Sequence, residues 1–326
     1  MNSKSIAVIG QGFVGGSLTT VFSEHGFDVY AYDKSGKYVK DASPCHGDAS
    51  EGYPCSVADL IGNNEGGATP GFSGVYFVCL PTPMYEDGSA DLRIVENVLE
   101  ELSSIPGDRI AVVKSTVPPG STENWNQKFN SNGLHIVFNP EFLTEANALD
   151  DMRNQSRIIL GGPRPWINTV KQVFQAAFPK VPLIKTSSTT AEMVKYMTNN
   201  FLTVKVAFAN EMAQICEALD KSGLNVDYDK VVEYAKYDPR LGESHWSVPG
   251  PDGHRGYGGS CFCKDINAMI SIARDLDVDP KVMQAAWDKN LEVRPERDWE
   301  QLIGRAVSTS PLLKTTSNEL THASVI

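Results

Sequence analysis

The sequence contains no apolar run that approaches the roughly 20 residues of a membrane-spanning helix. Its first residues, 1–4, have neither the basic nor the apolar region of a signal peptide. Basic residues are in the minority, with 29 Lys and Arg against 40 Asp and Glu and a net charge of −11. Because nucleic-acid affinity depends on clustered Lys and Arg, this balance argues against a nucleic-acid-binding protein. We expect a cytoplasmic protein with no membrane partner.

Cysteine is also scarce, with six residues in a chain of 326. That number in a chain of this length does not predict a disulfide framework, so most should be free thiols. Cys261 and Cys263 could form half of a metal site, but the only other paired candidates lie in a distant loop, at Cys45 with His46 and at Cys55. We therefore expect no metal. The chain length suits two domains.

A glycine-rich turn stands near the N-terminus. The apolar run 5–9 predicts a strand, and a helix-like segment extends to His25. Between them lie Gly10, Gln11, Gly12, Phe13, Val14 and Gly15. This spacing is typical of a dinucleotide site, in which the glycines permit a tight turn and a close approach of backbone to pyrophosphate. A second strand, 28–32, ends at Asp33, whose carboxylate suits the ribose of NAD and would repel the 2′-phosphate of NADP.

Four more β-like runs follow at 75–79, 110–113, 135–138 and 157–160, with helical or loop segments between them. The alternation predicts an α/β fold with a doubly wound, Rossmann-like parallel sheet. Ligands bind such sheets at the carboxyl ends of the strands. Candidate contacts after the first three of these runs are Thr82, Pro83, Ser115, Thr116, Glu141, Phe142, Leu143 and Glu145. Turn and cap formation alone would also explain proline, serine and threonine there.

Segment 189–219 has a helical apolar period without proline or glycine, which predicts one long helix that leaves the sheet and connects to a smaller all-helical domain. Lys195 and Asn199 share one face of it. Further helices are expected at 227–236, 260–276 and 280–306, and a long Gly- and Pro-rich loop at 238–257 is expected to be functional. The predicted domains are 1–188 and 189–307, followed by a disordered tail at 308–326.

A cysteine follows a glycine turn in Gly258-Gly259-Ser260-Cys261-Phe262-Cys263-Lys264-Asp265. If a helix begins near Ser260, Cys261 lies in its first turn, where free N–H groups and the helix dipole favour a thiolate. Asp265 would share its face. A buried structural cysteine beside a capping serine would give the same local pattern.

Together these segments resemble the nucleotide-sugar 6-dehydrogenase family from Ile6 to about Ser308. Seven motifs occur in the family's order, which is far more specific than any one of them. The residues that carry the resemblance are Gly10 to Gly15 with Asp33, Pro81-Thr82-Pro83, Ser115-Thr116-Val117-Pro118, Asn139-Pro140-Glu141-Phe142-Leu143 with Glu145, Lys195 with Asn199, Asp238-Pro239-Arg240, and Gly258-Gly259-Ser260-Cys261-Phe262 with Lys264-Asp265.

The resemblance implies an NAD-dependent four-electron oxidation of a primary alcohol on a nucleotide sugar to a carboxylate. Cys261 would form a thiohemiacetal and then a thioester. Lys195 would stabilise oxyanion charge or help to remove the hydroxyl proton, and Asn199 and Asp265 would position water. The remaining implied roles are hydrolytic acid/base for Glu141, nicotinamide-ribose and sugar contacts for Thr116 and Glu145, cofactor contact for Lys264, and substrate binding by Phe142, Leu143, Arg240, Tyr257, Gly258 and Gly259.

The resemblance further implies a homodimer built on the long helix, with Arg240 reaching the partner's site and the apolar stretch 201–208 buried between subunits. UDP-glucose is favoured as substrate over GDP-mannose or a UDP-N-acetylhexosamine. Family members usually carry a third, Rossmann-like domain that grips the nucleotide, and after Ala306 we find no strand–turn–helix pattern for it. That departure leaves recognition of the base unaccounted for.

Two other functions remain open. A two-electron β-hydroxyacid dehydrogenase also joins a Rossmann domain to a helical one and uses a helix lysine, but it gives no reason for Cys261, Glu141 or Glu145. A catalytically silent NAD-binding protein would be favoured by the loss of a catalytic residue, and no such loss is seen.

Overall fold

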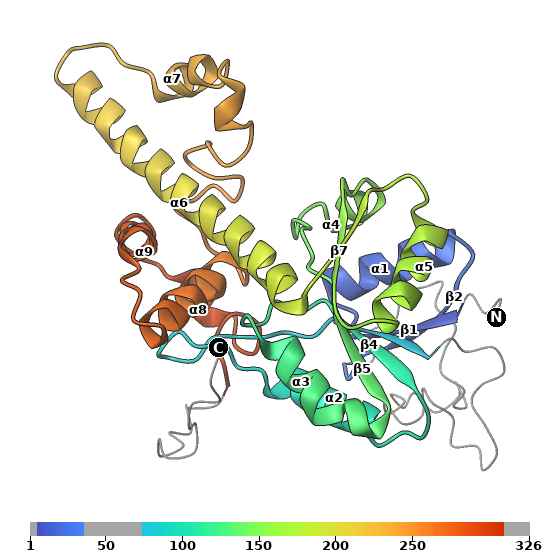
Figure 1. Ribbon diagram of the computed structural model, residues 1–326. Coiled ribbons are helices and arrows are strands. Elements are labelled where there is room, and N and C mark those ends of the chain that lie inside the picture. Colours follow the sequence, from blue (N-terminus) through green and yellow to red (C-terminus); the bar gives the residue numbers. More distant parts are fainter. Residues whose placement is uncertain (1–4, 36–73, 310–326) are drawn as a thin grey trace.

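The computed structural model describes residues 5–35 and 74–309 (Figure 1). Its strands are β1 (Ser5–Ile9), β2 (Asp28–Tyr32), β3 (Val75–Val78), β4 (Arg109–Val113), β5 (Leu134–Phe138), β6 (Ile158–Gly161) and β7 (Leu183–Thr186). Its α-helices are α1 (Phe13–Glu24), α2 (Arg93–Ser103), α3 (Ser121–Phe129), α4 (Ala148–Arg153), α5 (Trp166–Ala177), α6 (Ser188–Lys221), α7 (Tyr228–Ala235), α8 (Phe262–Asp275) and α9 (Lys281–Val293). Cys45, His46, Cys55 and most of the predicted tail lie outside the described residues.

The strands form one sheet in the order β2-β1-β3-β4-β5-β6-β7. Strands β1 to β5 are parallel, as predicted. The run after 157 does form a strand, but β6 pairs antiparallel with β5, and β7 then runs parallel to β6. The sheet is therefore mostly parallel rather than wholly so. An apolar run has the same residue pattern in either direction, so the sequence could not indicate this reversal.

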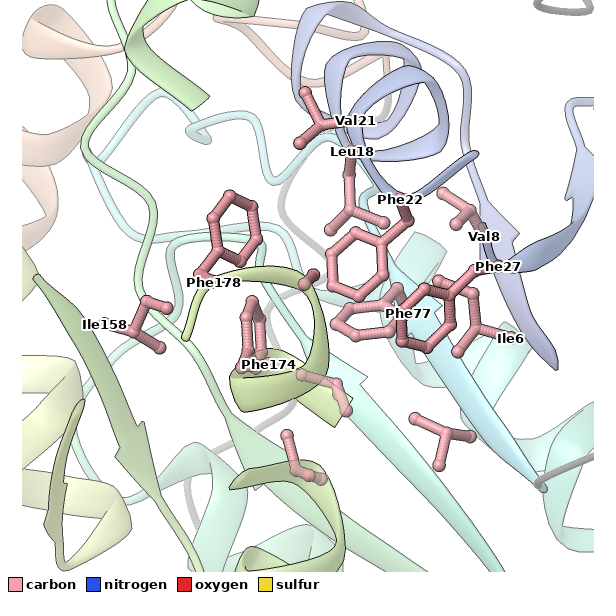
Figure 2. Packing of buried hydrophobic residues seen from close by; sticks show 14 of the residues in the cluster. Ile6, Val8, Leu18, Val21, Phe22, Phe27, Phe77, Ile158, Phe174 and Phe178 are labelled. Carbon is pink, nitrogen blue, oxygen red and sulfur yellow. The ribbon is translucent and has the colours of Figure 1, made fainter. Parts of the chain in front are cut away.

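Helices cover both faces of the sheet. On one face α1 and α5 pack over a cluster rich in aromatic rings, in which Phe22 contacts Phe77, Phe174 and Phe178 (Figure 2). Apolar residues of α2 and α3 cover the other face. This packing leaves the carboxyl ends of β1, β3, β4 and β5 beside one another, because the four strands are parallel neighbours.

The long helix α6 leaves the sheet, and α8 and α9 pack against it to make the helical region (Figure 1). It begins behind the N-cap Ser187, whose hydroxyl accepts a hydrogen bond from the Thr190 N–H at 3.2 Å. Even this 34-residue helix does not meet the requirements for crossing a membrane, and no other helix of the described residues does.

Two predicted helix bounds need correction. The segment 280–306 is not one helix, because α9 ends at Val293 and a short 3₁₀ turn follows at Asp298–Gln301. Pro295 explains the break, since the residue before a proline is forced out of the helical region. Helix α8 begins at Phe262, so Cys261 is its N-cap residue and does not lie within the first turn.

The predicted tail begins with ordered contacts. The Met84 N–H donates to Ala306 O and the Ser308 N–H donates to Met84 O, each at 2.8 Å. The Ser308 hydroxyl also donates to Asp91 at 2.6 Å. Residues 306–308 therefore return to the segment that follows β3.

Candidate active site

The glycine turn after β1 has the geometry of a dinucleotide cradle. Gly10 has φ +91°, and a Cβ there would lie 2.4 Å from the Cys79 carbonyl oxygen. A Cβ on Gly15 would lie 1.8 Å from Gly10 O, so α1 can pack this closely only because residue 15 is glycine. A Cβ on Gly12 would meet nothing within 4 Å. The second glycine thus faces open space, where a pyrophosphate needs room.

The rest of the cradle fits NAD. Gly12 is the N-cap of α1, no side chain caps that end, and its first turn holds no acidic residue, so its N–H groups can receive an anion. Asp33 follows β2 and accepts a hydrogen bond from the Gln11 N–H at 2.7 Å. The Gln11 side chain is itself buried against Thr19. The carboxylate predicted to bind the ribose therefore stands beside the glycine turn.

The segments after β3 and β4 are joined to each other. The Ser115 hydroxyl donates to Leu80 O at 2.6 Å and accepts from Leu80 N at 3.1 Å. The Thr82 hydroxyl donates to Thr116 O at 2.7 Å, and Pro83 is buried beside it. The predicted cofactor contacts Thr82 and Ser115 thus fix the two loops together, and the half-buried Thr116 is held at the carboxyl end of the sheet.

Glu141, which follows β5, is held by a lysine that sequence reasoning missed. Lys114 is buried at the end of β4, and its Nζ lies 2.7 Å from Glu141 Oε2 and 2.6 Å from Asn139 Oδ1. Glu141 Oε1 accepts from the Phe142 N–H at 2.9 Å. Both carboxylate oxygens therefore have donors. The only signal in the sequence was a lysine directly after an apolar strand.

Lys195 on α6 is buried in the same place, with 9% of its surface exposed. Its ammonium donates to the carbonyl oxygen of Glu141 and lies 5.6 Å from the Phe142 ring centroid. Burial lowers the pKa of Lys195, and the nearby charges of Asp265, Cys261 and Glu141 oppose that shift. A lysine of lowered pKa among these groups is suited to proton transfer and to oxyanion stabilisation.

Asp265 on α8 connects Asn199 to Lys264. Its carboxylate is 1% exposed, accepts from Asn199 Nδ2 at 2.6 Å and lies 2.5 Å from Lys264 Nζ. Its backbone N–H donates to Cys261 O at 3.0 Å. The predicted catalytic residues Cys261, Lys195, Asn199, Asp265 and Glu141 are therefore brought together, although they come from three segments of the chain.

The two neighbouring cysteines differ sharply. Cys261 is half-buried at the N-cap of α8, with its Sγ 3.9 Å from Ser260 Oγ. Cys263 is completely buried, donates to Tyr257 O, and has a pKa well above that of a free thiol because of desolvation. Burial likewise raises the pKa of Cys79 to about 12. Of these three thiols, Cys261 is the one placed to act as a nucleophile.

Of four predicted substrate contacts, Phe142, Gly258 and Gly259 lie near this group, but the Tyr257 side chain is directed into the helical core. Gly259 has φ +70° and open space around its α-carbon, while Gly258 lies against Arg294. The Tyr257 side chain points into the helical core, where its hydroxyl donates to Ala286 O at 3.3 Å. Phe142 lies beside Lys195, with the Arg157 guanidinium 4.2 Å from its ring centroid.

Three further predictions lie at or beyond the edge of the group. Leu143 packs against the aromatic core cluster. Glu145 is exposed and lies 2.7 Å from Arg305, a second residue that sequence reasoning missed. Arg240 is 86% exposed at its side chain, and the contacts described for it are with Asp238. Within one chain the structure does not bring Arg240 to Cys261.

No group of three His, Cys, Asp or Glu residues with the geometry to hold a metal ion occurs within 5–35 and 74–309. Because Cys45, His46 and Cys55 fall outside those ranges, the prediction of no metal stays a prediction.

Comparison with known proteins agrees with this geometry. Residues 4–177 match the NAD binding domain, and residues 189–292 the central domain, of the UDP-glucose/GDP-mannose dehydrogenase family. UDP-glucose 6-dehydrogenase of Haloferax volcanii is 33% identical over 316 residues, a match that covers 90% of this chain and 70% of that protein.

Solved structures show the same relationship. A UDP-glucose dehydrogenase of Pyrobaculum islandicum has a TM-score of 0.72 at 27% identity, covering 88% of this chain and 68% of that one. The UDP-D-ManNAc dehydrogenase of Pyrococcus horikoshii, at 23% identity and a TM-score of 0.71 over 89% and 68% of the two chains, shares the fold. This chain spans about two thirds of the length of these relatives. From its sequence, its cofactor cradle and these matches, the chain belongs to the UDP-glucose/GDP-mannose dehydrogenase family.

Proposed function

We propose that the chain oxidises UDP-glucose to UDP-glucuronate with NAD⁺, as a UDP-glucose 6-dehydrogenase. The observation that carries this proposal is the placement of the buried Lys195 within electrostatic range of Cys261 and Asp265, while Asn199, one turn along α6, donates to the Asp265 carboxylate. UDP-glucose is chosen because the relatives at 33% and 27% identity are named for it. In the net reaction the primary alcohol, one water and two NAD⁺ give a carboxylate, two NADH and three protons.

Bound NAD⁺ supplies the hydride acceptor for both oxidations. The thiolate of Cys261 forms a carbon–sulfur bond to the aldehyde, and the resulting thiohemiacetal keeps the intermediate on the enzyme. Its further oxidation gives a thioester. Lys195 donates to the oxygen on which negative charge develops, and burial of its ammonium strengthens that interaction.

Hydrolysis then breaks the carbon–sulfur bond. Asn199 and Asp265 hold the attacking water, Glu141 takes its proton, and the thiolate of Cys261 leaves. Lys114 fixes the Glu141 carboxylate through its 2.7 Å ion pair. Thr116, Glu145 and Lys264 contact the cofactor and the sugar in this scheme, while the loop around Gly258 and Gly259 binds the substrate.

The active unit in this proposal is a homodimer. Large apolar side chains on α6 are exposed in the single chain, among them Met197 at 71%, Phe201 at 64% and Phe208 at 52%. A second copy of α6 would cover this surface. Arg240, whose side chain is exposed and bonded to Asp238, would then contact the partner's substrate.

The test is the number of NADH molecules formed per UDP-glucose consumed at saturating NAD⁺, with GDP-mannose and a UDP-N-acetylhexosamine in parallel. Two NADH per UDP-glucose are expected. One NADH would indicate a simple alcohol dehydrogenase, and two with another sugar would keep the chemistry and change the substrate. No NADH with any of them, despite measurable NAD⁺ binding, would favour a catalytically silent protein.

The two cysteines provide a matched pair of variants. Cys261→Ala should bind NAD⁺ normally and form no acid, and Cys261→Ser should accumulate an ester-linked adduct visible by mass spectrometry. Cys263→Ala removes a buried thiol next to the site and should leave turnover within about twofold. Normal turnover by Cys261→Ala would refute the covalent mechanism, and loss of activity in Cys263→Ala would reopen a dithiol or metal function.

A further inference from the structure

Two polar side chains of the α9 segment are buried against the loop that precedes Cys261. Asn290 is 0% exposed, and Arg294, one helical turn later at the C-cap, is 3% exposed. Buried polar groups are costly unless they are paired, so their partners show what they hold. The partners of both lie in the segment 252–259 or support it.

Asn290 fixes the backbone of one residue from both sides. Its Oδ1 accepts from the Tyr257 N–H at 2.7 Å, and its Nδ2 donates to Tyr257 O at 2.9 Å. Gly256 lies so close that a Cβ there would be 2.3 Å from Asn290 Oδ1, and its φ is +68°. The Asn290 side chain thus satisfies both backbone polar groups of Tyr257, as a neighbouring strand does in a β-sheet.

Arg294 holds the same loop through its guanidinium. Its Nη1 lies 2.8 Å from Asp252 Oδ2, and its Nε donates to Asp298 Oδ1 at 2.6 Å. A Cβ on Gly258 would lie 2.4 Å from Arg294 Nη2. A backbone hydrogen bond from Gly259 also stabilises the Asp298 carboxylate. The residues next to the nucleophile are therefore enclosed by this charged group.

The helical region has other means of holding α9 in place. Met283, Ala286, Trp287 and Leu291 pack in an apolar cluster with residues of α6 and α8. The polar contacts of Asn290 and Arg294 instead fix the loop 256–259, which ends two residues before Cys261.

We propose that Asn290 and Arg294 are positioning residues for Cys261. By fixing residues 256–259 they set the distance between the thiol and Lys195. This inference rests on the proposed function for its catalytic consequence, but not for its structural one. A displacement of about 1 Å in a reacting group can cost about a hundredfold in rate.

The first experiment measures iodoacetamide labelling of Cys261 and Cys263 separately, together with kcat and the KM for NAD⁺. Arg294→Met should label Cys261 several times faster, since the released loop uncovers it, while kcat falls about a hundredfold and the KM for NAD⁺ stays within twofold. Arg294→Lys keeps one ion pair, so its Cys261 labelling rate and its kcat should lie between those of the wild type and Arg294→Met. Arg274→Met, an exposed arginine of α8, should change nothing.

Cys263 reports on folding in the same protein, because it is buried and unreactive unless the helical region opens. If Arg294→Met raised the labelling rates of Cys261 and Cys263 equally, the proposal would be overturned. An unchanged labelling rate of Cys261 would overturn it too. If the wild type forms no NADH with any nucleotide sugar, the proposed function fails and the labelling still decides whether Arg294 holds the loop.

A double-mutant cycle separates positioning from substrate contact at Gly258. Gly258 does not have the left-handed φ that favours glycine, so the loss of activity in Gly258→Ala should arise from the Arg294 and Asp298 atoms that lie within 2.7 Å of the new Cβ. Gly258→Ala should lower kcat strongly alone and less than threefold in the Arg294→Met background. Equal losses in both backgrounds would mean that Gly258→Ala does not act through Arg294, which contradicts the assigned role of Arg294.

Discussion

The two faces of α6 are reversed relative to an ordinary amphipathic helix. One face is buried and rich in polar side chains, with Glu192, Lys195, Asn199, Thr203 and Asn210 each at most 9% exposed. The other is apolar and exposed, and it carries Met193, Met197, Phe201, Phe208, Ile215 and Leu219. At about 100° per residue, these six apolar residues fall within an arc of ~80° on the opposite side of the helix.

Each face has its own set of partners. Glu192 accepts from the N–H groups of Gly120 and Thr122 at 2.6 and 2.9 Å, Lys195 donates to Glu141 O, and Asn199 donates to Asp265. The buried face thus joins the sheet to α8 at the candidate site. Helix α6 projects from the sheet (Figure 1), and its exposed apolar residues are spread along it from Met193 to Leu219. In the proposed function the buried side would take part in the chemistry and the exposed side in the association of two subunits.

The largest effect should come from the buried face. Lys195→Met keeps most of the length of the side chain and removes its charge, so kcat should fall by about 10² to 10⁴-fold while NAD⁺ still binds at the glycine turn. Steady-state kinetics and NAD⁺ titration would measure the two quantities. The control is Lys289→Met, because Lys289 pairs with Glu292 on α9 and has no part in the site. A loss of less than tenfold in Lys195→Met would remove Lys195 from the chemistry.

A smaller effect should follow from the exposed face. Phe201→Asp would place an unpaired carboxylate in the proposed dimer interface, which should weaken association by about 3 kcal/mol, or roughly a hundredfold. Sedimentation velocity over a concentration series would measure it. Val282 on α9 is 67% exposed, similar to Phe201 at 64%, and Val282→Asp should leave association unchanged. A dimer unaffected by Phe201→Asp would place the interface elsewhere.

The parts of this site that sequence could predict are those whose signal is local. The glycine turn, Asp33 and the helix from Ser188 to Lys221 each depend on residues close together in the chain. Lys195 and Asn199 could be paired because a helix repeats every 3.6 residues. Even the error at 280–306 had a local signal, since Pro295 marks the end of α9.

The parts that sequence could not predict depend on contacts between distant segments. Lys114 and Glu141 follow neighbouring strands and form an ion pair. Arg294 at the end of α9 lies against Gly258, which precedes α8, and Arg305 bonds to Glu145, 160 residues earlier in the chain. Periodicity also gave no reason to expect a buried polar face on α6. A lysine on a helix is usually solvated, and only packing against the sheet and α8 buries Lys195.

The smallest effect is a pH dependence of stability that belongs to the buried face alone. Burial lowers the pKa of Lys195 in the folded protein relative to the unfolded chain. Between the two pKa values the unfolded state binds one more proton, so the wild type should gain stability as pH rises through that interval, which lies below about 10.4. Lys195→Met lacks this proton, and its unfolding free energy should rise less steeply.

The slope should be steeper in the wild type than in Lys195→Met within the interval, by at most about 1.4 kcal/mol per pH unit, and the difference should vanish below it. Urea denaturation at a series of alkaline pH values would measure it. The slope is more informative than the pH-independent difference in unfolding free energy, because the substitution also removes the bond to Glu141 O at every pH. Equal slopes throughout would mean that Lys195 keeps its proton in the folded state as firmly as in water, and oxyanion stabilisation would then be its role in preference to proton transfer.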